Sequence, residues 1–405
     1  MGRNGACDEV MRNWLRNGWA SWQHLGMHPF LATAQSMLPQ VLSDIEAIVN
    51  IESPSRNASQ VAKSAAQLES IIQRVANRDA VQVDSDVGPH VLVPARGAAR
   101  ILLLGHHDTV HPIGTLAARP FSNDGKVLRG PGVFDMATGI VQAIYAMAIL
   151  ESAGVDTSGV EMLWTSDEEV GSSASRTLIE ERARGLGKTG AVLVLEPSAD
   201  GGALKIARKG TGTFDVRITG RASHAGLEPE KGINALLELA HQVQRISTFG
   251  NAELGTTVTP TVASAGTTDN TVPAEAHVLV DARVVVPEEK IRVEKLMSSL
   301  VPVVPGASIS VTGSLHRPPM HSSMSEELFA LAVESQRAVT GESMSGVSVG
   351  GGSDGNFTAA LGIRTLDGLG AVGGGAHGET EHVVIDSIAP RIALLAEIMQ
   401  RVLAQ

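Results

Sequence analysis

The chain of 405 residues is long enough for two domains, and its 43% hydrophobic and 19% charged residues are typical of an ordinary globular protein. Its formal net charge of −11 argues against a nucleic acid or an anionic membrane as partner, because no basic run offsets the acidic balance. Cys7 is the only cysteine, which excludes an intrachain disulfide and a thiolate metal site. Any bound metal must therefore use His, Asp and Glu.

Residues 1–26 differ in composition from the rest of the chain. They contain three of the four tryptophans, yet lack both the continuous apolar core and the small-residue cleavage site of a secretory signal. No apolar run in the chain reaches the length of a membrane span, which predicts a soluble protein. We expect a cytoplasmic location and an N-terminal extension over residues 1–37.

Helices and strands alternate through the first half of the chain. Apolar spacing predicts helices at residues 41–49, 68–75, 138–151 and 173–184, and strands at residues 81–83, 90–93, 101–104, 160–164 and 191–195. Strands that alternate with helices of this length indicate βαβ units and a mostly parallel sheet. Two further helices, at residues 325–339 and 386–403, return the chain to this sheet.

From about residue 210 the order changes to strand, helix, strand, strand, helix, strand. The expected elements cover residues 213–219, 233–246, 256–263, 277–285, 288–300 and 308–312. This is the order of the split-βαβ, ferredoxin-like arrangement, and about a hundred residues suffice to close a core. We therefore expect an inserted domain over residues 210–316, within a catalytic domain made of residues 38–209 and 317–405.

The strand at residues 101–104 is followed directly by polar residues. Four consecutive apolar residues predict a strand that is buried on both faces, and Gly105, His106, His107 and Asp108 come next. In an extended segment His106 and Asp108 point to one side while His107 points to the other. A carboxylate beside a histidine suits a metal ligand, because an acceptor on the second ring nitrogen fixes the tautomer.

Further polar residues follow other expected strands or turns. They are Asp135 after Gly130-Pro131-Gly132, the triplet Asp167-Glu168-Glu169, Glu196 before Pro197, and His377 in a glycine-rich loop. Open α/β sheets place their ligand sites at strand ends, where these residues would meet. Two histidines and three carboxylates at one sheet edge would be unfavourable unless cations neutralise them. Two zinc ions would do so.

The order, spacing and strand context of these motifs resemble the dinuclear zinc amidohydrolases, a family of glutamate carboxypeptidases, acetylornithine and succinyl-diaminopimelate deacylases, and aminoacylases. The similarity runs from about residue 38 to the C-terminus and is greatest to the glutamate carboxypeptidases. It implies an α/β fold in which a mostly parallel-sheet zinc-peptidase domain carries an inserted ferredoxin-like α+β domain for lid and dimerisation.

The resemblance also implies a metal centre and its chemistry. Two Zn²⁺ per subunit, or Co²⁺ or Mn²⁺ in their place, would be held by His106, Asp135, Glu169, Glu196 and His377. Asp135 would bridge the ions, Asp108 would orient His106, and Glu168 would be the general base. A cis peptide is implied after Asp135, where Met136 stands at a position that is polar in many relatives.

In the expected inserted domain, Ser223-His224-Ala225-Gly226 resembles the segment whose histidine stabilises the oxyanion across a dimer interface. This implies a homodimer built through that domain. The positions that match substrate-carboxylate binding are Asn270, Arg283, Gly351 and Gly352. Arg317 is a further substrate-binding candidate, a basic lid residue that would contribute to side-chain specificity with Arg208 and Lys209. For Arg283 the structural alternative is a pair with Asp281. The expected substrate is a small peptide or N-acyl amino acid with a free α-carboxylate, and basic lid residues favour an acidic side chain such as glutamate.

Three alternatives remain open. One is an N-acyl-amino-acid deacylase of the acetylornithine or aminoacylase type. Another is a serine hydrolase, because Ser348 lies in a G-x-S-x-G motif, although Gly350 to Gly352 make a poor start for the helix that such an elbow needs. The last is a non-catalytic metal-binding scaffold, whose mark would be a missing base or ligand, and none is missing.

Overall fold

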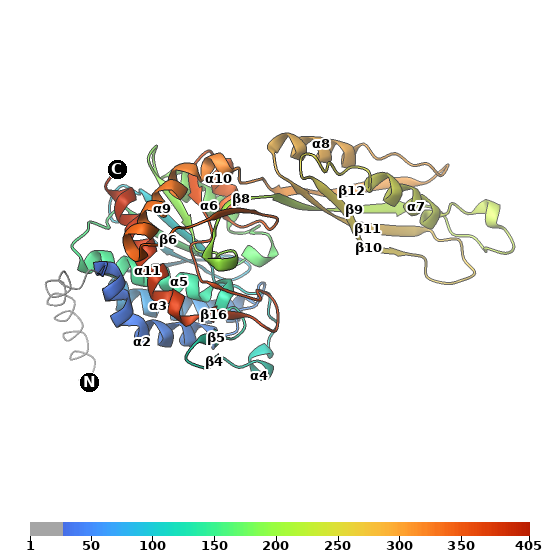
Figure 1. The fold of residues 1–405 in the computed structure, drawn as a ribbon. Coiled ribbons are helices and arrows are strands. Elements are labelled where there is room, and N and C mark those ends of the chain that lie inside the picture. Colours follow the sequence, from blue (N-terminus) through green and yellow to red (C-terminus); the bar gives the residue numbers. More distant parts are fainter. Residues whose placement is uncertain (1–26) are drawn as a thin grey trace. The chain divides into compact units, whose positions relative to one another are not determined.

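The computed structural model describes residues 27–405, which divide into two compact units (Figure 1). The larger unit contains the described residues up to Ile206 together with Ser322–Ser348 and Phe357–Gln405. The smaller unit consists of Ala207–His321 and Val349–Asn356, so it is slightly longer than the expected insertion over residues 210–316 and gains a second segment. The expectations for residues 1–26 lie outside the described part of the chain.

A six-stranded sheet forms the centre of the larger unit, in the order β1-β2-β6-β3-β7-β14. The strands are β1 (Val81–Val83), β2 (His90–Val93), β3 (Ile101–His106), β6 (Val160–Thr165), β7 (Ala191–Val194) and β14 (Arg364–Leu366). β6, β3, β7 and β14 run parallel, whereas β2 is antiparallel to β6 and β1 is antiparallel to β2. The sheet is therefore mostly parallel, as the alternation of helices and strands predicts.

Helices cover both faces of this sheet, so the central strand is buried on both sides. They are α2 (Pro29–Val49), α3 (Ala58–Ala76), α5 (Thr138–Ser152), α6 (Arg176–Arg184), α9 (Glu326–Thr340), α10 (Gly355–Ala360) and α11 (Ile385–Leu403). Ile101 and Leu103 of β3 pack in the core that includes α2, α3, α5 and α11. Leu102 and Leu104 pack in a second core with Ile179 of α6. Both cores thus fix the strand that ends at His106.

Helix α2 corrects the boundary of the N-terminal extension. It begins at Pro29, where the missing proline N–H is not needed by the helix, and the His28 ring accepts a hydrogen bond from the Phe30 N–H at 3.3 Å. Phe30 and Met37 are buried in the core of the larger unit. An extension that ends at residue 37 is therefore wrong, because residues 29–37 form the first turns of a core helix.

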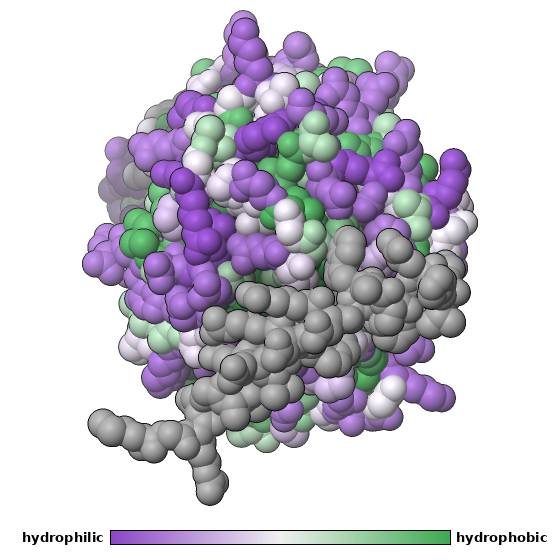
Figure 2. Space-filling model, turned by 90° about the vertical axis from the view of Figure 1, so that its left-hand side faces the viewer, coloured by the Kyte–Doolittle hydropathy of each residue, from purple (hydrophilic) through white to green (hydrophobic). Residues whose placement is uncertain are grey.

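The most apolar stretch of the larger unit is Val133–Ser152, which includes α5. Its 20 residues and mean hydropathy of 1.7 would allow it to cross a membrane by length and composition, so the expectation that no apolar run reaches that length is wrong. However, 94% of its apolar window is buried inside the protein, as expected for a helix at the centre of a core. Figure 2 shows one face of the protein, on which hydrophilic residues dominate and hydrophobic ones are scattered.

The smaller unit has the expected ferredoxin-like arrangement. Its four antiparallel strands, in the order β10-β11-β9-β12, are β9 (Gly210–Thr219), β10 (Thr257–Ala265), β11 (Glu275–Val284) and β12 (Ser308–Arg317). Helices α7 (Ala235–Ile246) and α8 (Pro287–Ser298) cover one face of this sheet (Figure 1). Every second residue of β11, from Ala276 to Val284, is buried on that face. The period of two therefore specifies which side of the strand meets the helices.

Two small sheets were not predicted. One has the order β15-β16-β5-β4 and joins β4 (Ser122–Asn123), β5 (Val127–Arg129), β15 (Gly373–Gly374) and β16 (His382–Val384), and the other pairs β8 (Leu204–Arg208) with β13 (Gly346–Val349). In the first, β16 pairs with β5 through His382 and Arg129. This pairing brings the loop that contains His377 beside the turn that leads to Asp135.

Candidate active site

Three of the predicted site segments begin where parallel strands end. His106 is the last residue of β3, Glu168 and Glu169 form a short 3₁₀ turn after β6, and Glu196 follows β7. Because parallel strands end at the same edge of a sheet, these side chains gather there.

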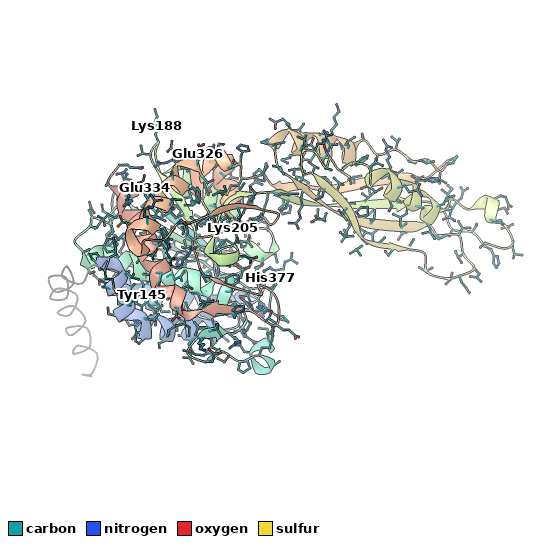
Figure 3. All side chains as sticks on the ribbon, viewed as in Figure 1. Tyr145, Lys188, Lys205, Glu326, Glu334 and His377 are labelled. Atoms are coloured by element: carbon teal, nitrogen blue, oxygen red, sulfur yellow. The ribbon has the colours of Figure 1, made fainter. Side chains whose placement is uncertain are left out.

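Asp135 and His377 reach the same place from outside the sheet. Asp135 lies in the tight turn Val133–Ala137 directly before α5, and its peptide bond to Met136 is cis, as the resemblance implied. His377 lies in the loop between β15 and β16, where Figure 3 shows it at the edge of the larger unit. Its side chain is half exposed.

The five predicted ligands meet in two groups that share one carboxylate. Nε2 of His106 is 3.2 Å from Oδ1 of Asp135 and 3.6 Å from Oε1 of Glu196. Nε2 of His377 is 3.3 Å from Oδ2 of Asp135 and 3.2 Å from Oε1 of Glu169. Asp135 therefore presents a different oxygen to each histidine, which is the arrangement of a carboxylate between two cations.

Two carboxylate oxygens of this cluster lack a hydrogen-bond donor among the described residues, as expected for atoms that bind a metal ion. Oδ1 of Asp135 and Oε1 of Glu169 are buried and accept no hydrogen bond from any residue between 27 and 405. A buried carboxylate oxygen without a donor is unfavourable unless a cation approaches it. The two atoms face the nitrogens of His106 and His377, so each lacks a donor at the position where a ligand group would bind a metal.

The electrostatics show the same need for positive charge. Burial lowers the pKa of His106, but its carboxylate neighbours outweigh burial and leave that pKa well above its usual range. Asp135 and Glu169 raise the pKa of His377 to about 10. Burial raises the pKa of Glu169. The carboxylates and histidines thus favour positive charge between them, which a divalent cation would supply.

Asp108 has a wider role than the sequence predicted. Nδ1 of His106 lies 3.0 Å from the main-chain carbonyl of Asp108 and 3.5 Å from its carboxylate, so the carbonyl contributes to the ring's orientation. The Asp108 carboxylate accepts the N–H groups of Glu168 at 3.2 Å and Glu169 at 3.3 Å. It also accepts the Ser55 hydroxyl at 2.6 Å, a contact that no sequence motif signalled. Asp108 thus fixes the main chain of both glutamates.

The residues next to the ligands have structural roles. His107 points away from the cluster, with Nδ1 at 3.2 Å from the Ser64 hydroxyl and Nε2 at 3.1 Å from the Pro89 carbonyl. The buried Met136 accepts the main-chain N–H of His106 at its sulfur, at 3.4 Å. An apolar residue after Asp135 is therefore compatible with the site, because it packs behind His106.

In the smaller unit the structure brings His224 and Asn270 together. The main-chain N–H of Ala225 donates to the Asn270 carbonyl at 2.8 Å. Nδ1 of His224 accepts the N–H groups of Gly226 at 3.1 Å and Leu227 at 3.2 Å. In a neutral ring the proton must then be on Nε2, which leaves that nitrogen as a hydrogen-bond donor.

Arg283 pairs with Asp281, the structural alternative to a role in substrate binding. Its guanidinium group forms a two-point pair with Asp281, at 3.1 and 3.2 Å, and donates to the Gly350 carbonyl at 2.9 Å. A substrate carboxylate would have to share this arginine with Asp281.

Two more arginines surround the same glycine turn. Arg208 donates to the carbonyls of Gly351 and Gly352, each at 3.2 Å. The buried Arg317 pairs with Asp354 at 2.9 Å. The turn from Gly350 to Gly352 is thus held by guanidinium groups through its carbonyl oxygens.

The structure argues against a serine nucleophile. Ser348 lies within strand β13, and the next helix, α10, begins only at Gly355. A nucleophile elbow requires a sharp turn from strand directly into helix. His377, the histidine that a triad would need, faces Asp135 and Glu169 instead.

Comparison with known proteins decides the family. Residues 102–401 match peptidase family M20/M25/M40. The chain belongs to this family. It is 30% identical over 374 residues to carboxypeptidase G2 of Pseudomonas sp. (strain RS-16), which covers 89% of each chain. It is also 28% identical over 324 residues to succinyl-diaminopimelate desuccinylase of Acinetobacter baumannii (strain ATCC 17978), which covers 74% of this chain and 82% of that enzyme.

The fold of this M20 peptidase is shared with solved structures. The M20 family metallo-carboxypeptidase of Sulfolobus solfataricus superposes with a TM-score of 0.72 at 16% identity, covering 90% of this chain and 99% of that one. The resemblance to dinuclear metallohydrolases, the α/β fold and the classification as a hydrolase of the metallopeptidase class are therefore confirmed.

Proposed function

We propose that this M20 peptidase hydrolyses the amide bond to an amino acid that has a free α-carboxylate. The observation that supports this most is the placement of Asp135, whose two oxygens face His106 and His377. We assign His106, Asp135 and Glu196 to one ion and His377, Asp135 and Glu169 to a second, with zinc as the expected metal and cobalt or manganese as alternatives. When bound, such ions lower the pKa of a water molecule to about 7 and polarise a carbonyl.

Glu168 is the proposed general base. Its carboxylate lies in a group with His106 and Glu196 whose atoms are all within 4.8 Å of one another, and Asp108 fixes its main chain. It would take a proton from the attacking water at a carboxylate oxygen and transfer it to the leaving nitrogen. A carboxylate next to the ligands can do this without a second titrating group.

We propose that His224 stabilises the oxyanion that forms on the scissile carbonyl. The two main-chain N–H groups on Nδ1 leave Nε2–H as the donor, which is the form an oxyanion needs. This histidine would act in the active site of a second subunit of a homodimer. Its neighbour Asn270 has a side-chain amide that could donate to the substrate carboxylate.

The substrate carboxylate would be held in part at the arginine-rich glycine turn. Gly351 and Gly352 are the proposed contacts together with Arg317. Arg317 and Arg283 are weaker donors, because Asp354 and Asp281 already pair with them. A bidentate arginine pair discriminates in favour of a free acid. Basic residues such as Arg208 favour an acidic side chain, with glutamate preferred. Lys209 contributes less, because its Nζ donates to the Gly255 carbonyl at 2.6 Å.

Comparison of matched substrates tests this specificity. We expect N-acyl-glutamate to be hydrolysed faster than N-acyl-leucine and N-acetylornithine, and each free acid faster than its carboxamide, measured as kcat/KM on metal-loaded protein. Equal rates for acid and carboxamide would contradict the carboxylate site. Preference for leucine would remove only the glutamate assignment. Preference for N-acetylornithine would favour the second candidate function, a deacylase, which the similarity to the desuccinylase supports.

A further inference from the structure

A buried carboxylate that does not face the proposed ions organises the turn of the bridging ligand. Glu381 is only 2% exposed and lies in the loop between His377 and β16. Its Oε1 accepts the N–H groups of Phe134 and Asp135, and its Oε2 accepts that of Gly132, all at 3.0 Å. Three main-chain donors of one turn thus converge on a single side chain.

The network continues from Glu381 to the segment of the second histidine. Nε2 of His111 lies 2.9 Å from Oε2 of Glu381, and Arg119 donates to Nδ1 of His111 at 3.2 Å. Arginine cannot accept a hydrogen bond, so Nδ1 is the acceptor, and the ring proton lies on Nε2 and is donated to Glu381. Arg119 also donates to the carbonyl of Gly378, the residue after His377, at 2.7 Å.

Apart from the shared Asp135, the network reaches the group around His377 and not the one around His106. Its hydrogen bonds end at the main chain of Asp135 and at Gly378 beside His377. His106 and Glu196 are instead positioned by β3 and β7 of the buried parallel sheet. Loss of the network should therefore disturb the group around His377 more than the group around His106.

We propose that Glu381 is a positioning residue that sets the affinity of the His377, Asp135 and Glu169 group for its metal ion. The inference depends on the proposed metal centre. Asp135 can serve two ions only if its carboxylate keeps one orientation, and Glu381 holds the main-chain N–H of Asp135 together with those of Gly132 and Phe134 before it. Groups that orient metal ligands in this way typically change metal affinity by about 10 to 100-fold when they are removed.

The test is metal titration of Glu381→Gln in the full-length protein. The amide keeps the size of the side chain, but its NH₂ group cannot accept the hydrogen bonds of Gly132 and His111. Metal-free wild type and variant are titrated with Co²⁺, followed by calorimetry and by the visible spectrum. We expect wild type to bind two ions. In the variant we expect one ion to bind unchanged and the other about 10 to 100-fold more weakly.

Activity at different metal concentrations separates positioning from a general loss of structure. We expect kcat of Glu381→Gln to fall at limiting metal and to recover with excess metal, while KM stays near that of wild type. Glu379→Gln is the matched control, because Glu379 is exposed in the same loop and should behave as wild type. His111→Phe keeps the three main-chain hydrogen bonds to Glu381, so it should weaken binding of the same ion by a smaller factor. If Glu381→Gln does not fold, metal titration of His111→Phe tests the positioning role in its place.

Two results would overturn the inference: equal weakening of both ions, or unchanged metal affinity in a variant that is merely less stable. Failure of the proposed function has a different signature, because wild type itself would then bind fewer than two ions.

Discussion

Glu168 and Glu169 are adjacent in the chain, yet their side chains have different surroundings. Oε1 of Glu169 lies 3.2 Å from Nε2 of His377, whereas Glu168 is grouped with His106 and Glu196. Asp108 fixes the main chain of both glutamates through their N–H groups. Asp135 instead pairs with the histidines. These different surroundings are the basis for the distinct roles proposed for the two residues, Glu168 as base and Glu169 as ligand.

This difference gives the first prediction at the residue scale. Glu168→Gln should keep both metal ions and the fold but lose about 10² to 10⁴ in kcat, the range for general acid-base catalysis. KM should change little, since no substrate-carboxylate donor is removed. Steady-state kinetics together with metal analysis of the same preparation would measure both quantities.

Glu169→Gln is the matched control in the neighbouring position. We expect it to lose metal at the group around His377, because an amide is a much weaker ligand than a carboxylate. If Glu168→Gln loses metal and Glu169→Gln keeps it, the two roles are exchanged. A Glu168→Gln enzyme within a few-fold of wild type would remove Glu168 from the mechanism.

At the scale of elements, the start of α5 lies against the end of β7. A Cβ atom added to Gly139 of α5 would lie 2.2 Å from the main-chain oxygen of Leu195, the residue before Glu196. A Cβ on Gly370 would lie 2.1 Å from the same oxygen. The strand end that carries Glu196 is thus enclosed by two glycines, and neither position has space for a side chain.

Substitution of Gly139, the second residue of α5, therefore distinguishes the effect of packing from that of helix propensity. Alanine is favoured over glycine within a helix by about 1 kcal/mol, so propensity alone predicts that Gly139→Ala stabilises the protein. The contact with Leu195 predicts the opposite, a loss of about 1 to 3 kcal/mol, because main chain must move. Urea unfolding of metal-free protein measures the sign, and metal titration should show weaker binding through Glu196.

A variant elsewhere in the same helix measures the cost of glycine away from the metal ligands. Ala148→Gly should lower the free energy of unfolding by about 1 kcal/mol through helix propensity, and by a further amount because the Ala148 methyl is buried, without changing metal affinity. A stabilised Gly139→Ala protein would show that the strand end moves freely, which would contradict the packing argument.

The elements that the sequence predicted share long apolar or periodic runs. The strand at residues 101–104 and the helix at residues 138–151 were placed to within two residues of their structural bounds, because their burial leaves a pattern in the sequence. β4, β5, β15 and β16 have two or three residues each and leave no such pattern. The sequence does not predict the start of α2, although Pro29 is a helix-start signal, because the expected N-terminal extension reaches beyond the unusual residues 1–26 to residue 37.

The residues of the candidate site also fall into those that the sequence predicts and those that only the structure reveals. His106, Asp135, Glu168, Glu169, Glu196 and His377 were named from strand ends and from the resemblance, and the structure gathers them. Glu381 was not named, since its partners are 246 to 270 residues away and its local sequence is as polar as that of the exposed Glu379. Contacts over such distances along the chain depend on the fold, so only the structure could reveal that one of two neighbouring glutamates is buried.

At the scale of the whole molecule, the two units contribute different functional groups. All proposed metal ligands lie in the larger unit, and His224 and the arginine-rich turn lie in the smaller one. The smaller unit also has β10 at an edge of its sheet, and its exposed large hydrophobic residues include Leu227, Leu236, Leu237, Val262 and Ile291. An edge strand with exposed apolar side chains is a surface that a second copy of the chain could cover.

We therefore predict a homodimer that forms through the smaller unit, and a pair of edge-strand variants can test it. Val262 on β10 and Val81 on β1 are 54% and 50% exposed, and each strand lies at the edge of its sheet. Light scattering should show a wild-type dimer, a shift toward monomer for Val262→Asp, and no change for Val81→Asp. Metal content should stay constant in all three, because the ligands lie in the larger unit. A wild-type monomer with full activity would contradict the prediction.

The same dimer predicts that two inactive proteins restore activity when mixed. His224→Ala should lose about 10² to 10³ in kcat, as expected for an oxyanion donor, and Glu168→Gln loses the base. If His224 acts in the site of the other subunit, a mixed dimer contains one site with both an intact Glu168 and an intact His224. An equal mixture that exchanges subunits should then recover about a quarter of wild-type activity, because half the dimers are mixed and each has one working site. If subunit exchange is confirmed but no activity returns, His224 acts within its own chain.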